Sequence, residues 1–269
     1  ANEAAHYEFG ASLAGQCVRK VLDEVTEGKT ELELAQLLSA YGQPLSVQTI
    51  CASGQRFTNA VAAPRKKKAG VGEQFTVTMG LRGGLTCRTG YVVGESRELP
   101  REEKDYLEQA AKPYYRALAV WYSETRIGRS AGEIYSEIEQ VIPKSIYGWK
   151  LNPGHYTAGE EWMSSPFWEG SEIILKSGML LQMDIIIKVP GYGGANAEDG
   201  ILLADEQLRR EIKDQYPQVW NRMMRRRTYM REILGIPIGD DMLPMSGICG
   251  YYRPYVLNKD WAFKIKVTP

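Results

Sequence analysis

Three residues in the second half of the chain have side chains suited to acid–base chemistry or to metal binding: His155, Asp184 and Glu198. Asp184 is a lone acid in an apolar run that begins at Gly178, and Glu198 opens the next apolar run beyond a glycine-rich connection. A carboxylate buried alone is very costly, so Asp184 must be paired, bound to a metal or turned to a cavity. Only two histidines are present, which nearly excludes a site built from two or three of them.

These side chains allow two kinds of chemistry. His155 can act as a general acid or base, since an unperturbed imidazole titrates near ~6.5. Asp184 and Glu198 would then hold a cationic group, and Glu160 or Glu161 would orient the imidazole. The same histidine and two acids also form a plausible ligand set for a single Mn, Fe or Zn ion. The structural alternative is that Asp184 caps a turn, Glu198 is solvated and His155 is an ordinary hydrogen-bonding residue.

The elements that must position these residues follow from the hydrophobic pattern. Residues 178–206 predict two antiparallel core strands joined by a mobile loop. A threonine N-cap at Thr30 begins a helix that extends to about Tyr41. The remaining predictions are an amphipathic helix over 3–26, strands over 47–52, 74–79 and 85–93, a helix-rich stretch over 102–125, and helices after 206. The segment 243–267, rich in Pro, Gly and Tyr, is expected to wrap the domain edge.

The helix and strand pattern occurs twice. Equivalent residues lie 100 apart in the pairs Gly28 and Gly128, Thr30 and Ser130, Glu33 and Glu133, Leu34 and Ile134, and Leu38 and Ile138. Gly72 precedes Thr78 by the same interval that separates Gly178 from Asp184. This order predicts an internal duplication, in which two α+β halves, about 1–100 and 101–212, pack into one pseudo-symmetric domain with a C-terminal extension over 213–269. A binding site is expected where the halves meet.

Composition excludes several classes of protein. The 33 basic and 33 acidic side chains cancel, so no global field attracts nucleic acid or an anionic membrane. No apolar run is long enough for a transmembrane helix, and no signal peptide is visible at the N-terminus. The four cysteines are widely spaced, which favours reduced thiols and a cytoplasmic location. The arginine run at 225–227 is interpreted as a solvated or salt-bridged helix face.

The duplicated halves and the stretch 178–206 together resemble the pita-bread fold of creatinase, aminopeptidase P, prolidase and methionine aminopeptidase. The matching motifs are Gly178-Met179 leading to Asp184, Glu198-Asp199 leading to Leu203, Gly154-His155 with Gly159, Ser53-Gly54, and Gly72-Glu73 leading to Thr78. The resemblance covers about residues 3–212 and implies a single α+β pita-bread domain. The family's separate N-terminal domain is missing, so the chain is expected to be the C-terminal part of a longer protein. A homodimer is possible.

The resemblance also implies which site residues have changed. The family holds two metal ions with two aspartates, one histidine and two glutamates. The histidine stands here as His155, and the glutamates as Asp184 and Glu198. The aspartate positions fall at Thr78 and in a shortened turn that contains Cys87, and neither carries an acid. Two auxiliary histidines of the family fall at Val61 and at Met163-Ser164.

Because too few acids remain for a pair of cations, the sequence predicts loss of dinuclear metallopeptidase activity and no bound cofactor. Three functions compete. The first is a metal-independent hydrolase or lyase acting on a small amine, guanidino or peptide-like compound. The second is a non-catalytic module that binds a peptide or protein, with Tyr156 and Tyr192 among its contacts. The third is a mononuclear metal hydrolase with His155, Asp184 and Glu198 as ligands. In each, the expected partner is a small molecule or peptide rather than nucleic acid or membrane.

Overall fold

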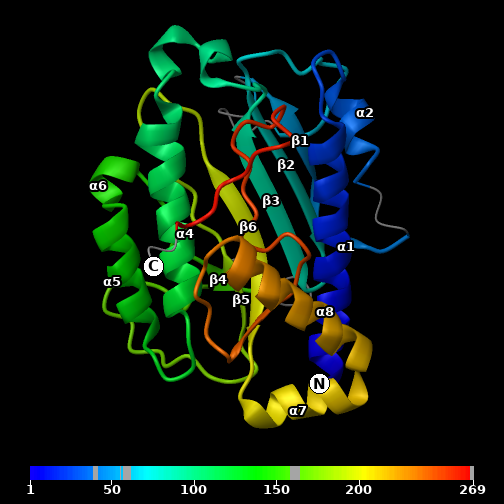
Figure 1. Ribbon diagram of the computed structural model, residues 1–269, viewed down its shortest axis with the longest axis vertical. Coiled ribbons are helices and arrows are strands. Elements are labelled where there is room, and N and C mark those ends of the chain that lie inside the picture. The colour runs from blue at the N-terminus through cyan, green and yellow to red at the C-terminus, as the bar shows by residue number, and fades with distance from the viewer. Residues whose placement is uncertain (39–41, 55, 57–61, 158–163, 267–269) are drawn as a thin grey trace.

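A curled antiparallel sheet organises the protein, as the computed structural model in Figure 1 shows. The structure describes residues 1–269 apart from 39–41, 55, 57–61, 158–163 and 267–269. The strand order is β1-β2-β3-β6-β5-β4, with β7 paired beside β6. The strands are β1 (Leu45–Ser53), β2 (Gln74–Leu81), β3 (Gly84–Tyr91), β4 (His155–Tyr156), β5 (Leu180–Met183), β6 (Asn196–Leu203) and β7 (Met242–Pro244).

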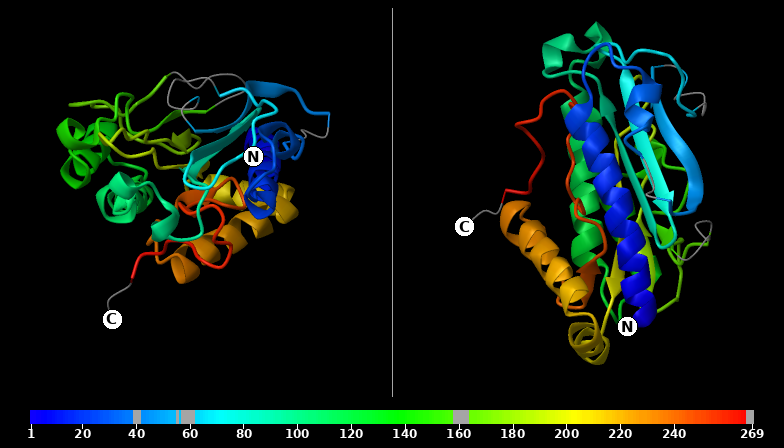
Figure 2. Two further views of the ribbon diagram at one scale, coloured as in Figure 1. Left: turned by 90° about the horizontal axis from the view of Figure 1, so that it is seen from above. Right: turned by 90° about the vertical axis from the view of Figure 1, so that its right-hand side faces the viewer.

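Helices pack on this sheet and complete the α+β architecture, which confirms the predicted fold class. The α-helices are α1 (Asn2–Glu24), α2 (Glu31–Ala35), α4 (Lys112–Glu124), α5 (Ala131–Val141), α6 (Lys144–Tyr147), α7 (Glu206–Gln215) and α8 (Pro217–Thr228). Short 3₁₀ or π segments are η1 (Ser96–Glu98), η2 (Arg101–Glu103), η3 (Leu107–Ala111) and η4 (Tyr229–Ile233). Helix α1 packs on β2 and β3, while α4 packs on α5 and β5 (Figures 1 and 2). Among the described residues, no helix has the length and apolar character needed to cross a bilayer.

The local structure repeats where the sequence pattern repeats. Both Thr30 and Ser130 form a capping box, in which the hydroxyl accepts from the backbone N–H three residues later and the glutamate there accepts in return. Gly28 and Gly128 both have positive φ, 84° and 92°, just before these caps. The first capped helix is shorter than predicted, because α2 ends at Ala35. The predicted end near Tyr41 lies outside the described residues.

The C-terminal segment is part of the interior and does not merely wrap an edge, so that prediction was wrong. Residues 242–244 form a strand beside β6, and Met245 and Tyr252 are almost fully buried. In Figure 1 this orange-to-red segment lies between α1 and α4. It buries enough apolar surface to join the two helix-covered halves of the core.

Local predictions near the site have different outcomes. The strand predicted over 85–93 is confirmed, since β3 pairs with β2 from Gly84 to Tyr91, and the shortened turn that the family resemblance placed at 85–88 is not formed. The apolar strand expected to contain Asp184 ends at Met183, one residue earlier. The glycine-rich connection after it was expected to be mobile, yet hydroxyls hold it, since Tyr91 accepts from Gly193 N and Tyr106 donates to Gly194 O.

Three arginines of α8, namely Arg222, Arg226 and Arg227, form ion pairs within the protein, in agreement with the salt-bridged interpretation. Arg226 pairs with the buried Glu8 of α1 at 2.7 Å, and Arg222 pairs with the same carboxylate at 2.5 Å. Arg227 donates to the carbonyl of Gly239 and to Asp240. These contacts anchor α8 to α1 and to the segment before β7.

Candidate functional site

His155 is fixed by a glycine before it and a carbonyl after it. Gly154 has φ +108°, and a Cβ there would lie 2.7 Å from the carbonyl oxygen of Gln182, so only glycine lets β4 approach β5. His155 Nδ1 lies 2.7 Å from the Tyr156 carbonyl oxygen. Because a carbonyl oxygen can only accept, Nδ1 carries the proton and Nε2 presents its lone pair.

Asp184 follows directly after β5, and Asn196 of β6 holds one of its oxygens. Asn196 Nδ2 donates to Asp184 Oδ1 at 3.0 Å, and Asn196 Oδ1 accepts from Glu198 N at 3.1 Å. The second carboxylate oxygen, Oδ2, lies 3.9 Å from His155 Nε2. Asn196 therefore fixes one oxygen of Asp184 and leaves the other turned toward His155.

Glu198 lies in β6, and Arg88 holds its backbone carbonyl from the opposite face of the sheet. Arg88 Nη1 donates to the carbonyl oxygens of Cys87 and Glu198. Arg88 also binds Asp199 and the C-terminal carbonyls of Ile248 and Tyr251. Since neighbouring strand residues alternate between faces, Glu198 and Cys87 point away from this C-terminal segment.

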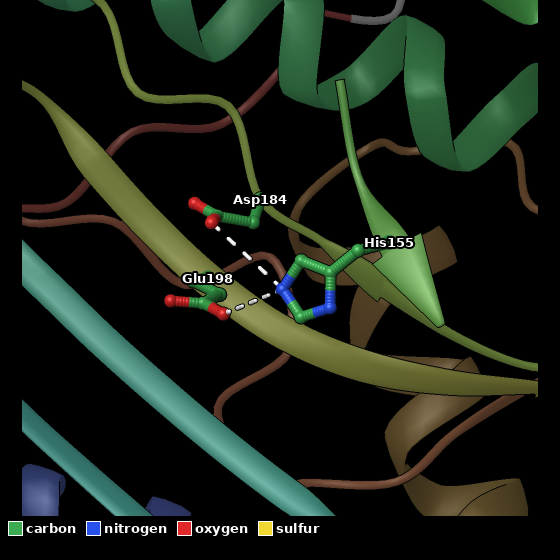
Figure 3. A group of neighbouring side chains, drawn as sticks. All are labelled: His155, Asp184 and Glu198. Carbon is green, nitrogen blue, oxygen red and sulfur yellow. Dashed lines mark ion pairs between the residues drawn. The ribbon is translucent and has the colours of Figure 1, made fainter. Parts of the chain in front are cut away.

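The three side chains converge, as Figure 3 shows. Glu198 Oε1 lies 3.5 Å from His155 Nε2, and one ligand atom from each residue falls within 4.8 Å of the others. All three residues are buried. His155 Nε2 and Glu198 Oε1 have no hydrogen-bond partner among the described residues. Buried polar atoms almost always have a partner, so this arrangement is that of a site built to receive a ligand.

Burial and mutual repulsion dominate the electrostatics. Burial, and then the charge of Asp184, raise the pKa of Glu198 well above its ordinary value. Burial also raises the pKa of Asp184, despite the opposing effects of His155 and Asn196. Burial alone would lower the pKa of His155, but its contact with Glu198 and the two nearby negative charges raise it overall. A cation bound between the acids would favour their ionised forms and so oppose these upward shifts.

Neutral groups occupy the neighbouring part of the same face. Cys87 stands opposite Glu198 in the β3–β6 ladder, and Thr78 stands opposite Cys87 in the β2–β3 ladder. Burial, and then the charge of Glu198, raise the pKa of the Cys87 thiol to about 12. Thr76 shares a hydrogen bond of 2.9 Å with Thr89 one step further along. These residues supply hydroxyls and a protonated thiol where a second cation would need carboxylates.

Two residues predicted for the site, Tyr156 and Tyr192, are not brought to this group. Tyr156 faces away from His155, because adjacent strand residues alternate, and it lines a separate pocket of ≈ 390 Å³ beside the start of α1. Tyr192 lies on the connection between β5 and β6, where its hydroxyl donates to Asp105. The predicted Glu160 and Glu161, together with Val61 and Met163, lie outside the described residues. A substrate-binding role for them stays a prediction.

The sequence analysis missed two residues that share the face of the acids. Asn196 precedes Glu198 by two positions, and Gln182 precedes Asp184 by two. Strand periodicity places residues two apart on one face, so this spacing was the available signal. Both side chains are buried, and the Oε1 atom of Gln182 has no partner among the described residues.

The donor set fits a divalent cation. One imidazole nitrogen and two carboxylate oxygens suit Mn, Fe or Zn, and one such atom from each residue lies close to the other two. The histidine tautomer required of a ligand is the one that the Tyr156 carbonyl selects. A second ion beside the first would meet only the neutral groups of Thr78 and Cys87.

Comparisons with known proteins agree with this architecture. A family model described as metallopeptidase family M24 matches residues 6–205. The chain is 27% identical over 220 residues to an Xaa-Pro dipeptidase of Pyrococcus furiosus, covering 77% of this chain and 60% of that protein. It resembles the solved structure of an Xaa-Pro dipeptidase from Bacillus anthracis, with a TM-score of 0.62 and 23% identity over 77% of this chain and 59% of that one.

An X-Pro aminopeptidase from Thermotoga maritima is also similar, with a TM-score of 0.58 and 18% identity over 76% of this chain and 59% of that one. At these identities the solved structures show the fold alone, which is the pita-bread fold that the sequence predicted. The chain spans about 60% of the length of the curated relatives that it matches.

Proposed function

The chain belongs to metallopeptidase family M24, and from that premise we propose that it is a hydrolase of peptide-like compounds that uses one divalent metal ion. His155, Asp184 and Glu198 would hold the ion. The observation that carries the proposal is the convergence of three buried ligand atoms within 4.8 Å, two of them without another partner among the described residues.

One ion is proposed rather than two because of the neighbouring residues. Thr78 and Cys87 lie on the same face as Glu198, but they bring no negative charge to that position. A pair of cations 3.5–4 Å apart generally requires bridging carboxylates, which this face lacks beyond Asp184 and Glu198.

Each residue has a distinct part in the proposed reaction. The ion supplies Lewis-acid activation of water and of the scissile carbonyl. His155 directs Nε2 into the site because its Nδ1 is held by a carbonyl oxygen. Asp184 would offer Oδ2, since Asn196 holds Oδ1. Glu198 would offer Oε1, which has no hydrogen-bond partner among the described residues.

Xaa-Pro dipeptides are the first substrates to test, because the curated relatives are Xaa-Pro dipeptidases. The protein should be purified without added metal, analysed for its elements, and then loaded in turn with Mn²⁺, Co²⁺ and Zn²⁺. The proposal expects one ion per chain and hydrolysis that both His155→Ala and Glu198→Gln abolish. Failure to retain any ion after reloading would refute it, and two ions per chain would refute the mononuclear site.

A second candidate is a metal-independent hydrolase or lyase in which His155 is the acid or base. The 3.5 Å approach of His155 Nε2 to Glu198 Oε1 favours it, since such a pair can exchange a proton through a bound substrate. Turnover that persists in a strong chelator and is lost in His155→Ala would select this candidate. Saturable peptide binding without turnover over a broad amine and dipeptide panel would instead identify a binding module.

A further inference from the structure

Gln182 lies in the floor of the site, although nothing in its residue type marks it as catalytic. It stands opposite His155 in the β4–β5 ladder, and directly opposed residues share a face. Its side chain is fully buried and lies across β6 above Gly200. A Cβ on Gly200 would be 2.9 Å from Gln182 Oε1, so glycine at this position makes room for the amide.

The amide of Gln182 has a fixed orientation. Its Nε2 donates to the carbonyl oxygen of Leu85 in β3. The backbone pairing of β3 with β6 ends at Cys87 and Glu198. Beyond that pair, the Gln182 side chain crosses from β5 over β6 and reaches Leu85 of β3. Because the Leu85 carbonyl can only accept, the nitrogen must face Leu85 and the oxygen must face elsewhere.

Among the described residues, that oxygen is the third buried atom of the group without a hydrogen-bond partner, after His155 Nε2 and Glu198 Oε1. The N–H group of the same amide hydrogen-bonds Glu198 and lowers the pKa of that acid, so the amide lies beside a ligand of the proposed ion. A buried amide oxygen without a partner costs about 1–3 kcal/mol. The cost disappears if a cation lies within reach of the oxygen.

We infer that Gln182 Oε1 is a fourth ligand of the ion held by His155, Asp184 and Glu198, an assignment that rests on the proposed function. A neutral amide oxygen added to two carboxylates and one imidazole makes a set of three oxygens and one nitrogen. Oxygen-rich sets suit hard divalent ions, so the inference selects Mn²⁺ over softer ions. Gln182 thereby adds a ligand without adding a charge to the site.

The test is calorimetric titration of the metal-free protein with Mn²⁺, comparing wild type with Gln182→Leu and Gln182→Glu. The leucine variant removes the oxygen, and we expect it to weaken Mn²⁺ binding roughly 10- to 100-fold. The glutamate variant loses the donor to Leu85 but keeps an oxygen, so it should bind Mn²⁺ at least as tightly as wild type. Gln207→Leu, on the exposed face of α7, is the matched control and should bind like wild type.

The glutamate variant separates a ligand from a merely structural residue. If Gln182 only joined β3 to β6, both variants would weaken binding equally, and the inference would be overturned. Unchanged affinity in Gln182→Leu would overturn it too, while leaving the proposed function intact. If the leucine variant does not fold, weaker binding by Gln182→Glu than by wild type decides against the inference. A wild-type protein that takes up no ion would end both proposals.

Discussion

Asn196 connects the two acids of the site through one side chain. Its Nδ2 donates to Asp184 Oδ1 at 3.0 Å, while its Oδ1 accepts from the backbone N–H of Glu198 at 3.1 Å. The Asn196 amide therefore fixes the orientation of the Asp184 carboxylate relative to β6, the strand that carries Glu198. Asn196 is a positioning residue, since its polar atoms bind the acids and do not point at the common ligand position.

Replacing Asn196 should loosen the site without removing a ligand. In Asn196→Leu, the Asp184 carboxylate loses the donor that holds Oδ1 and can rotate. We expect metal affinity to fall roughly 10- to 100-fold, as is typical when a group that orients a ligand is lost. Calorimetric titration measures this, and Asn221→Leu, an exposed position on α8, is the matched control. Equal affinities in the two variants would show that Asn196 does not orient Asp184.

Glu198→Gln should stabilise the metal-free protein while abolishing its response to metal. Burial and the charge of Asp184 raise the pKa of Glu198, so the ionised acid destabilises the folded state above its ordinary titration range. The amide removes that charge. In chelator at pH 8 we expect the variant to melt a few degrees higher, since 1 kcal/mol corresponds to about 2–4 °C in chains of this size. A lower melting temperature would contradict the repulsion between the two acids.

The ion pair of Arg88 and Asp199 should be costly to break from one side. Both side chains are almost fully buried and lie 2.5 Å apart. Arg88→Met leaves the Asp199 carboxylate unpaired, at an expected cost of about 3–5 kcal/mol in urea unfolding. The double variant Arg88→Met with Asp199→Leu should recover part of that loss. If the double variant is as unstable as the sum of the two single variants, the two side chains are not coupled.

The contact of Glu8 with α8 should make stability depend on pH. Burial would raise the pKa of Glu8, but hydrogen bonds and charge from Arg222 and Arg226 lower it overall. Because the folded pKa lies below the unfolded one, the stabilisation is complete above the ordinary pKa near 4.5 and is lost as pH falls through the folded value.

Glu8→Gln should therefore lose about 2 kcal/mol at pH 7, a value typical of hydrogen bonds to charged groups. Urea unfolding of both proteins from pH 7 to pH 3 tests this, and the difference between them should shrink at the acid end. A difference that stays constant over this range would mean that the charge of Glu8 does not contribute.

The sequence predicted features that depend on local chemistry or on the duplication. The capping boxes at Thr30 and Ser130 follow from residue types three apart, and a hydrogen bond needs nothing more distant. The resemblance placed His155, Asp184 and Glu198 at family ligand positions, and the structure brings all three together.

Features that depend on tertiary register were missed. The family resemblance placed a shortened turn at 85–88, although the residue pattern predicted a strand over 85–93, and pairing of β3 with β2 continues through these residues. Gln182 and Asn196 look like ordinary polar residues within apolar runs. Their importance comes from which strands lie opposite them, and the sequence of a single strand does not contain that information.

All the N–H groups of the Arg88 guanidinium donate to backbone or side-chain oxygens. Two of the acceptors are the carbonyl oxygens of Ile248 and Tyr251. Arg88 thus connects residues 248–251 to the strand that carries Glu198, on the face of the sheet opposite the Glu198 side chain. A chain that stopped at β7 would leave two N–H groups of the buried Arg88 guanidinium without their acceptors. We therefore expect residues 248–251 to support, from the opposite face of the sheet, the strand that carries Glu198.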